Sequence, residues 1–257
     1  MQISLEGKRA LICGGTQGIG KGIAQGMAAS GAKIILASRS EKSATNIADT
    51  LDGEGHGFLS LDQESKKSIE DASGAIRNLG VDIIVNNTGG PDPGKLVDEE
   101  WANFEKAITK QLYCSQMLTI AAIENMKKKQ FGRVINIIST SVKIPIPGLA
   151  VSNTLRGAIA SWSKTLSSEV APFGITVNNL LPGFIETNRL KQVIDSRAEK
   201  EGITPAVVAA NMLETIPAKR FGQPSDMGNL AIFLASDYGS YITGTSICVD
   251  GGKTGAL

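Results

Sequence analysis

Seven residues near the N-terminus have the types and the spacing of a phosphate-binding turn. They follow a short apolar run at residues 9–13, precede an amphipathic stretch, and form the pattern Gly-x-x-x-Gly-x-Gly. Glycines at Gly14 and Gly18 permit a tight turn and a close approach of the backbone to a pyrophosphate, and the helix that follows supplies N–H donors and a positive dipole end. The pattern therefore predicts that a dinucleotide binds here. The residues expected to contact it are Gly14, Thr16, Gln17, Gly18, Ile19 and Gly20.

A basic residue follows the second apolar run, at residues 33–38. This run ends in Ser38, and Arg39 occupies the position at which a carboxylate would accept hydrogen bonds from the 2′-hydroxyl of an adenosine ribose. A guanidinium there can instead hold a 2′-phosphate through a charge-assisted fork. Ser38 and Arg39 therefore predict a preference for NADP(H) over NAD(H). The alternative is that Arg39 is only a solvated loop residue.

Four more segments follow in an order and at a spacing that resemble the short-chain dehydrogenase/reductase family. They are Asp62 after the third apolar run, Asn-Asn-Thr-Gly at 86–89, Pro-Gly-x-x-x-Thr at 182–187 and Val-Asp-Gly-Gly at 249–252. The resemblance covers essentially the whole chain and is strongest to the 3-oxoacyl-acyl carrier protein reductase-like branch, although Cys13 replaces the threonine that usually precedes the first glycine. It implies an NAD(P)-dependent oxidoreductase acting on a carbonyl/alcohol pair. The further cofactor contacts that it implies are Asp62, Asn87, Gly89, Arg156, Pro182, Gly183, Ile185 and Thr187.

The catalytic positions of the resembled family are largely changed in this chain. In that family a serine polarises the carbonyl, a tyrosine donates the proton, a lysine lowers the tyrosine pKa and binds the nicotinamide ribose, and an asparagine completes a water-linked relay. The serine is present as Ser139, whereas the positions of the tyrosine, lysine and asparagine hold Ser152, Arg156 and Gln111. No Tyr-x-x-x-Lys occurs anywhere in the sequence. Our candidate catalytic residues are therefore Ser139, Ser152, Arg156 and Gln111.

These replacements change the available proton chemistry. A serine hydroxyl is a much weaker acid than a phenol, and a guanidinium holds its proton too tightly to relay it, although Arg156 keeps a positive charge that can bind ribose hydroxyls. Ser152 and Arg156 are four residues apart on one helix face and can act together. Lys143 and Ser141 lie close to Ser139 in sequence, but a solvated lysine and an ordinary loop hydroxyl are the simpler interpretations.

Three functions therefore stay open. The first is an oxidoreductase with altered proton delivery at a repurposed site. The second is a catalytically silent NADP-binding protein that acts as a sensor or oligomer partner, and the third is a non-redox enzyme on the same scaffold. The fold alone does not choose among them.

Short apolar runs alternate with longer amphipathic stretches along the whole chain, and these are the elements that must position the candidate residues. Several runs are apolar at successive positions, which is typical of parallel strands covered on both faces. The alternation predicts a single domain over residues 1–257, with one doubly wound Rossmann-type parallel sheet of about seven strands and helices on both faces. Long helices are expected at 99–129 and 149–171, and the segment 188–214 is expected to form a mobile substrate lid. The expected strands are 9–13, 33–38, 56–61, 81–86, 133–138, 175–181 and 246–249.

The composition excludes several partners. The 257 residues include 26 basic and 25 acidic side chains, so no electrostatic argument supports binding to nucleic acid or an anionic membrane. Three distant cysteines without a Cys/His cluster favour a reducing compartment and no metal site. No signal peptide is recognisable, and no apolar run approaches the ~20 residues of a membrane span. We therefore expect a cytoplasmic protein whose partner is a small carbonyl or alcohol, and the resemblance implies a homotetramer or homodimer.

Overall fold

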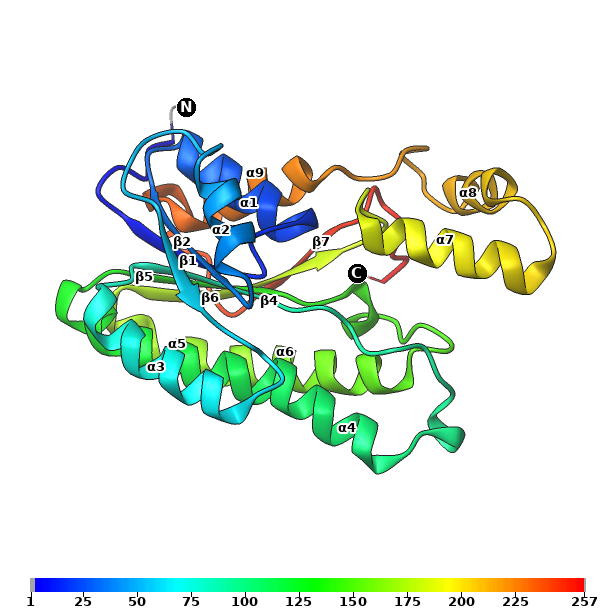
Figure 1. Cartoon of the computed structure of the whole chain (residues 1–257), viewed down its shortest axis with the longest axis horizontal. Coiled ribbons are helices and arrows are strands. Elements are labelled where there is room, and N and C mark those ends of the chain that lie inside the picture. Colours follow the sequence, from blue (N-terminus) through cyan, green and yellow to red (C-terminus); the bar gives the residue numbers. More distant parts are fainter. Residues whose placement is uncertain (1–2, 257) are drawn as a thin grey trace.

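The computed structural model has the doubly wound parallel sheet that the sequence predicts. Within residues 3–256, which the structure describes, seven parallel strands pair in the order β3-β2-β1-β4-β5-β6-β7 (Figure 1). The order reverses between β1 and β4, so the loops after these two strands diverge and leave a crevice at the carboxyl edge of the sheet. The strands are β1 Arg9–Cys13, β2 Lys33–Ser38, β3 Gly57–Ser60, β4 Ile83–Asn87, β5 Gly132–Ile137, β6 Ile175–Pro182 and β7 Ser246–Val249.

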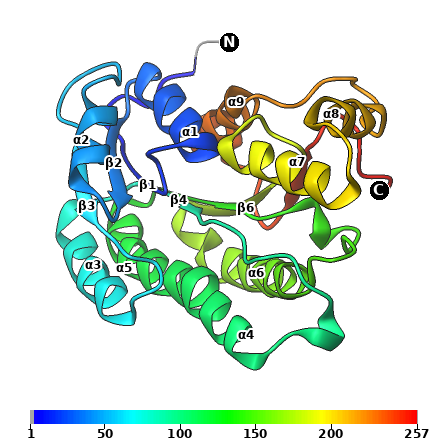
Figure 2. The same ribbon diagram turned by 45° about the vertical axis from the view of Figure 1, so that its right-hand side comes forward.

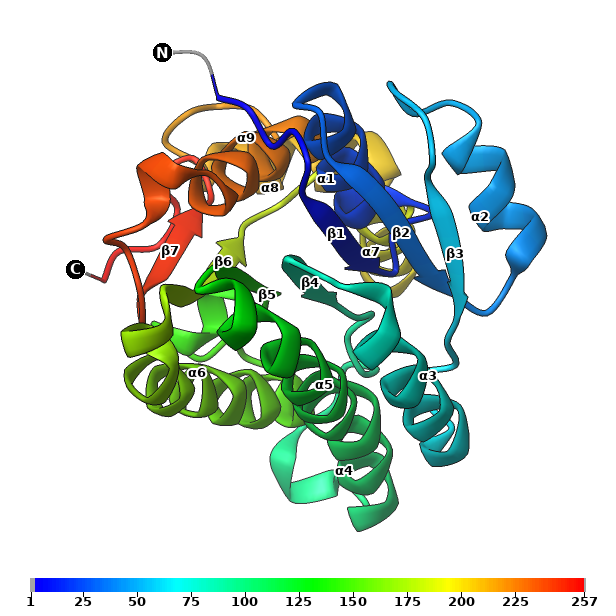
Figure 3. The ribbon, with the colours of Figure 1, turned by 90° about the vertical axis from the view of Figure 1, so that its left-hand side faces the viewer.

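Helices cover both faces of the sheet, which explains why the strands are apolar at successive positions. Figure 3 shows α1, α2 and α9 on one face and α3, α5 and α6 on the other. Neighbouring strand residues alternate between two cores, so Ile12 packs in the core beneath α1 and α9 while Leu11 packs in the core beneath α3 and α5. The helices are α1 Gly18–Ala29, α2 Glu41–Ala48, α3 Lys66–Leu79, α5 Cys114–Lys129, α6 Ala150–Val170 and α9 Pro224–Ala235.

Four strands, β3 to β6, have bounds that differ from the expected ones, β5 and β6 by no more than one residue at each end. β3 has four residues instead of six because it is an edge strand that pairs only with β2. β4 begins at Ile83, where its ladder with β1 starts, and the Asp82 carboxylate just before it accepts the backbone N–H of Arg9 at 2.9 Å.

The long helix expected at 99–129 starts two residues later and is not uniform. It consists of α4 Trp101–Ala107, a π-helical segment Ile108–Tyr113, and α5. The π-helical turn is wider than an α-helical one, so the side chains that follow it point in directions that a regular helix would not give them. This segment contains the candidate Gln111.

The segment 188–214 forms two helices after β6. They are α7 Asn188–Glu201 and α8 Pro205–Glu214, and Figure 2 shows them next to one another, beyond the end of β6. The hydroxyls of Thr187 and Thr204 cap them by accepting backbone N–H groups of the first turns. Their apolar residues form a small core of their own that includes Leu190 and Met212.

Candidate active site

One cleft at the carboxyl edge of the sheet contains almost all of the predicted site residues. It has a volume of about 2100 Å³, and its walls come from the loops after β1, β2, β3, β4, β5 and β6 together with α7. Of the residues named as candidates, Gly20 and Gln111 are the two that do not line it.

The turn after β1 has a shape that depends on glycine. Gly14 and Gly18 have φ angles of +60° and +52°, which residues with a Cβ rarely adopt. A Cβ at Gly20 would lie 2.2 Å from the carbonyl oxygen of Gly14, so a side chain there would push the turn open. Gln17 is the N-cap residue of α1, and its side chain makes no capping hydrogen bond. The first N–H groups of α1 are therefore left for a ligand in the cleft.

Asn87 joins the turn after β1 to the end of β4. Its side-chain Nδ2 donates to the carbonyl oxygens of Cys13 and Gly14 at 3.2 and 3.3 Å, and its own carbonyl accepts from Nε2 of Gln63 at 3.2 Å. These bonds hold together the two loops that diverge at the point where the strand order reverses. Gly89 follows on the exposed side of the cleft wall.

Arg39 lies exposed on the cleft at the end of β2, next to the start of α2. Ser38 Oγ donates to the carbonyl of Ser40, and Ser40 Oγ accepts the N–H of Ser43 as the cap of α2. A guanidinium and a helix N-terminus therefore meet at this end of the cleft, and both are suited to an anion.

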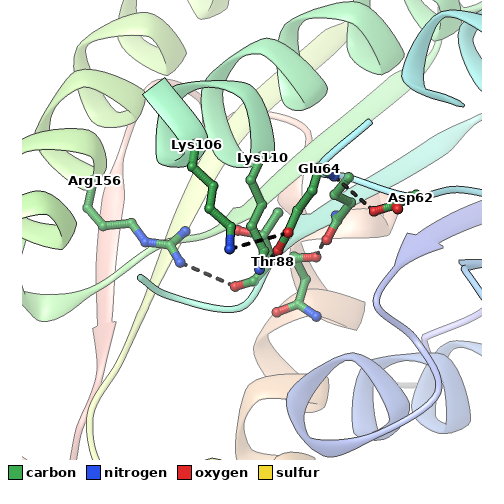
Figure 4. Close-up of polar contacts among 8 residues, drawn as sticks. Asp62, Glu64, Thr88, Lys106, Lys110 and Arg156 are labelled. Carbon is green, nitrogen blue, oxygen red and sulfur yellow. Dashed lines mark hydrogen bonds and ion pairs between the residues drawn. The ribbon is translucent and has the colours of Figure 1, made fainter. Parts of the chain in front are cut away.

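Asp62 shapes the loop that follows β3. Its carboxylate accepts the N–H of Glu64 at 3.0 Å (Figure 4). Its own N–H donates to Ser68 Oγ at 2.9 Å. Glu64 in turn pairs with Lys110 at 2.8 Å and Lys106 at 3.5 Å. The hydrogen bond from Lys110 is the main reason that the pKa of Glu64 is lowered. Sequence reasoning missed this cluster, for which the four-residue spacing of the two lysines was the only local signal.

The segment after β6 closes the cleft opposite the glycine turn. Gly183 donates its N–H to the carbonyl of Val249 at 2.9 Å, and a Cβ at Gly183 would lie 2.7 Å from Cα of Asp250. Pro182 ends β6, and Ile185 forms an isolated bridge with Gly222. A Cβ at Gly18 would lie 3.1 Å from Cγ2 of Thr187, so the two segments approach closely across the cleft.

Ser139 and Ser152 are both half-buried in the cleft wall. Ser139 follows β5, and its Oγ accepts the N–H of Ser141 at 3.0 Å, which leaves its O–H free to donate. Ser152 lies in the first turn of α6. The two hydroxyls therefore come from different elements but face the same space.

Arg156 is the most unusual group in the cleft. It is 6% exposed, and its Nη1 donates to the carbonyl of Ile137 at 3.0 Å. Its Nη2 donates to the carbonyl of Thr88 at 3.2 Å (Figure 4). Burial lowers its pKa to about 10. No carboxylate in the part of the chain that the structure describes pairs with it. The guanidinium therefore links the ends of β4 and β5 and remains charged at neutral pH.

Gln111 does not join the other three catalytic candidates. It is 1% exposed, and neither atom of its side-chain amide has a hydrogen-bond partner among the described residues. The cleft is instead lined by Lys110, its neighbour in the π-helical segment. A regular α-helix through this region would turn a different set of residues toward the cleft. Nothing in the local sequence predicts the π-helical turn.

Two loops form the wall beside the serines, and the sequence analysis missed the residue that holds one of them. Asn153 clamps Ile146, because its Oδ1 accepts the N–H and its Nδ2 donates to the carbonyl of that residue, at 3.3 and 2.9 Å. Gly94 pairs with Gly148 and Ala150 through backbone bonds of 2.9 and 3.3 Å. Lys143, in the same loop, is exposed and does not line the cleft.

The described residues contain neither a metal-binding cluster nor a membrane-spanning helix. Residues 3–256 contain no group of three or more His, Cys, Asp or Glu side chains that could hold a metal ion. Over the same residues no helix combines the length and apolar character that crossing a membrane requires.

Comparisons with known proteins show the family to which the chain belongs. The family model described as enoyl-(acyl carrier protein) reductase matches residues 14–254. The 3-oxoacyl-[acyl-carrier-protein] reductase FabG of Haemophilus influenzae is 38% identical over 96% of this chain and 98% of that protein. The chain belongs to the short-chain dehydrogenase/reductase family. Within this family it lies in the FabG-like branch, and its relatives are oxidoreductases.

Other members resemble it over nearly their full length. The 2-dehydro-3-deoxy-D-gluconate 5-dehydrogenase of Bacillus subtilis is 35% identical over 97% of this chain and 95% of its own. Among solved structures, the L-sorbose reductase of Gluconobacter frateurii in complex with NADPH and L-sorbose has a TM-score of 0.94 at 26% identity, with all of both chains covered. YwfH, an NADPH dependent reductase involved in bacilysin biosynthesis, has a TM-score of 0.90 at 27% identity, covering 97% of this chain and 99% of that one.

Proposed function

We propose that this chain is an NADP(H)-dependent oxidoreductase that interconverts a small carbonyl compound and the corresponding alcohol. The observation that supports this most is that a glycine-dependent cradle opens onto the same cleft as Ser139, Ser152 and Arg156. Family membership supplies the reaction class, and the cleft supplies the residues.

The residues present fit a dinucleotide. A Cβ at Gly20 would fill the turn, and the first turn of α1 has N–H groups available for a pyrophosphate. Arg39 would hold a 2′-phosphate, and Asp62 would contact the adenine. The remaining contacts that we propose are Thr16, Gln17, Ile19, Ser38, Asn87, Gly89, Pro182, Gly183, Ile185 and Thr187.

NADP(H) is the preferred cofactor in this proposal. Arg39 forms no ion pair within residues 3–256, so its guanidinium is available for a phosphate. The relatives named above as NADPH dependent or bound to NADPH agree with this preference.

Ser139 and Arg156 would stabilise the oxygen of the substrate. Hydride exchange with the carbonyl carbon is the chemistry that NADP(H) would supply when bound. The Ser139 hydroxyl and the Arg156 guanidinium would donate hydrogen bonds to the oxygen as negative charge develops on it. Because the Arg156 pKa is about 10, the guanidinium keeps its proton at neutral pH and acts through charge. The proton that completes the alcohol would come from water through the Ser152 hydroxyl.

A turnover assay tests this function. The purified chain should oxidise NADPH with at least one carbonyl in a broad panel, followed by nicotinamide absorbance, and Ser139→Ala should abolish that activity. Binding of NADPH without turnover, detected as a raised Tm, would support the silent binding protein, which the missing tyrosine and lysine also favour. Conversion of a substrate without a net absorbance change would indicate a non-redox enzyme.

We also propose a single domain in which α7 and α8 act as a lid, and an assembly of two or four copies. The lid proposal rests on the separate small core of these helices. The assembly proposal rests on the family and on the exposed apolar side chains of Val97 and Trp101, which are 90% and 65% exposed. Sedimentation equilibrium of wild type and Trp101→Glu tests the assembly.

A further inference from the structure

The buried charge of Arg156 lacks a partner that would normally accompany it. Two of its N–H groups bond to backbone carbonyls, which are neutral, and no carboxylate within residues 3–256 pairs with it. A buried charge without a counterion is costly, and proteins normally supply one. Further N–H donors of the guanidinium remain for a ligand, because Arg156 also lines the cleft.

Most of the charged side chains that α7 contributes to the cleft wall are basic. Arg189, Arg197 and Lys200 line the cleft together with one carboxylate, Glu201, whereas Asp195 and Glu199 do not line it. None of these three basic side chains forms an ion pair with any residue of the described chain. The lid therefore offers positive charge toward the cleft. Such a surface raises the local concentration of an anion and its rate of entry.

Carboxylates also line the cleft, but each of them is either bonded elsewhere or exposed. Glu64 is paired with Lys110 and Lys106, and Asp62 accepts a backbone N–H in its own loop. Asp92, Glu186 and Glu201 are exposed. None of these five carboxylates forms an ion pair with the buried guanidinium.

The anionic groups of the cofactor have other candidates to bind them. The free N–H groups of α1 suit a pyrophosphate, and Arg39 suits a 2′-phosphate. Arg156 is anchored to Thr88 and to Ile137, and Ile137 lies two residues before Ser139. Its unused donors are therefore expected to meet the substrate.

We propose that the substrate carries a carboxylate on or next to the carbon that exchanges hydride, that Arg156 binds this carboxylate, and that the basic side of α7 attracts it. This proposal rests on the oxidoreductase function proposed above. It names the chemical class of the substrate: a small oxo acid or hydroxy acid instead of a neutral ketone, sugar or acyl thioester.

Matched substrates provide the first test. With NADPH, wild-type protein should reduce acetoacetate or pyruvate with a kcat/KM at least about tenfold above that for the corresponding methyl ester, the loss expected when a charge-assisted pair is removed. A preference for the esters, or for a neutral 3-oxoacyl thioester, would overturn the proposal and leave the oxidoreductase function intact.

A binding measurement separates the proposal of a carboxylate substrate from the proposal of an oxidoreductase function. Oxamate, a carboxylate next to a carbonyl that cannot be reduced in this assay, is titrated by calorimetry into the cofactor-free and the NADP⁺-loaded protein. Arg156→Gln should weaken oxamate binding at least about tenfold, with Arg156→Lys intermediate because an ammonium lacks the planar fork. The double variant R189Q/R197Q should weaken binding a few fold at low salt, an effect that salt should remove.

The matched control is Lys191→Gln, which removes a charge from the same helix but lies outside the cleft wall. It should leave oxamate affinity unchanged, and circular dichroism checks the fold of every variant. Arg156-dependent binding of oxamate without any turnover would support the inference while contradicting the oxidoreductase proposal. Turnover of neutral substrates without oxamate binding would do the reverse. Absence of both, or loss of NADP⁺ affinity alone in Arg156→Gln, would overturn the inference.

Discussion

The two sides of the cleft are built in different ways. On the side of β1 and β4, the backbone makes the site: Gly14 and Gly18 take φ angles that favour glycine, and Gly20 has no room for a side chain. On the side of β5 and α6, side chains make the proposed site, and the sequence predicts that Ser152 and Arg156 occupy the positions of a tyrosine and a lysine in the family. A site made by backbone tolerates few changes, whereas a site made by side chains can change its chemistry through substitutions that leave the scaffold as it is.

A buried ladder of amides gives both sides the same rigid support. Asn86, Asn136 and Asn179 lie opposite one another on β4, β5 and β6, and Asn179 lies opposite Ser246 on β7. Asn86 Nδ2 donates to Asn136 at 2.8 Å, Asn136 Nδ2 donates to Asn179 at 3.0 Å, and Asn179 Nδ2 donates to Ser246 at 3.1 Å. Each strand of the ladder therefore has a fixed register just before it reaches the cleft. The two sides therefore differ in whether the backbone or the side chains form the surface that faces the cleft.

The largest effect is expected from a side chain in the glycine turn. Gly20→Val should lower NADPH affinity by more than about a hundredfold, because its Cβ would meet the Gly14 carbonyl and displace the first turn of α1. Calorimetry with NADPH measures the loss. Gly74→Ala is the matched control: this exposed glycine of α3 has no atom within 4 Å of an added Cβ. It should stabilise the protein by about 0.5–1 kcal/mol and leave affinity unchanged.

Restoring the tyrosine and lysine of the family tests whether the β5 and α6 side of the cleft has lost the family's activity or has acquired another one. The double variant S152Y/R156K should lower activity on the natural substrate by about a hundredfold, because one ammonium cannot span the carbonyls of Ile137 and Thr88 as the guanidinium does. NADPH affinity should change by much less. A large gain in carbonyl reduction would contradict this expectation and show that the chain had lost an activity that two substitutions restore.

The same contrast explains how much the sequence could predict. The sheet was predictable because runs such as Ile83-Ile84-Val85 are apolar at successive positions, and the glycine turn was predictable because its shape excludes other residues. The seven-stranded fold is confirmed, while the roles of the site residues stay predictions. The bonds of Arg156 to Ile137 and Thr88 were not predictable, because the partners are 19 and 68 residues away in sequence. The pairing of Glu64 with Lys110 likewise depends on how the loop after β3 and the π-helical segment are placed relative to one another.

A moderate effect is expected at the adenosine end. Arg39→Ala should lower the preference for NADPH over NADH by about tenfold, because it removes the one guanidinium that we assign to the 2′-phosphate. The ratio of kcat/KM values for the two cofactors measures it, and the KM for the carbonyl substrate should not change. Lys42→Ala, a charge change in the neighbouring helix outside the cleft wall, is the control. An unchanged ratio in Arg39→Ala would mean that Arg39 is a solvated residue.

The smallest effect concerns Cys13, which directly precedes the first glycine of the turn on the backbone-made side. Burial raises the pKa of its thiol from 9.0 to about 12. The folded protein therefore keeps this proton when the unfolded chain has lost it, so the stability contributed by the neutral thiol is complete below pH 9 and is lost as the pH rises from about 9 toward about 12. Between pH 7.5 and 9.5 the loss assigned to Cys13 is roughly 1 kcal/mol.

Urea unfolding at these two pH values measures that contribution. Cys13→Ala should lose less stability than wild type over this interval, by the amount assigned to the thiol. Cys248→Ala, at a half-buried cysteine whose pKa is raised less, should behave nearly like wild type. Iodoacetamide at pH 8 should likewise leave Cys13 unmodified in the folded protein. If Cys13→Ala followed the wild-type pH dependence, or if Cys13 were alkylated without unfolding, the turn after β1 would be more open than its glycine-dependent geometry implies. The distinction between a backbone-made side and a side-chain-made side would then lose its physical basis.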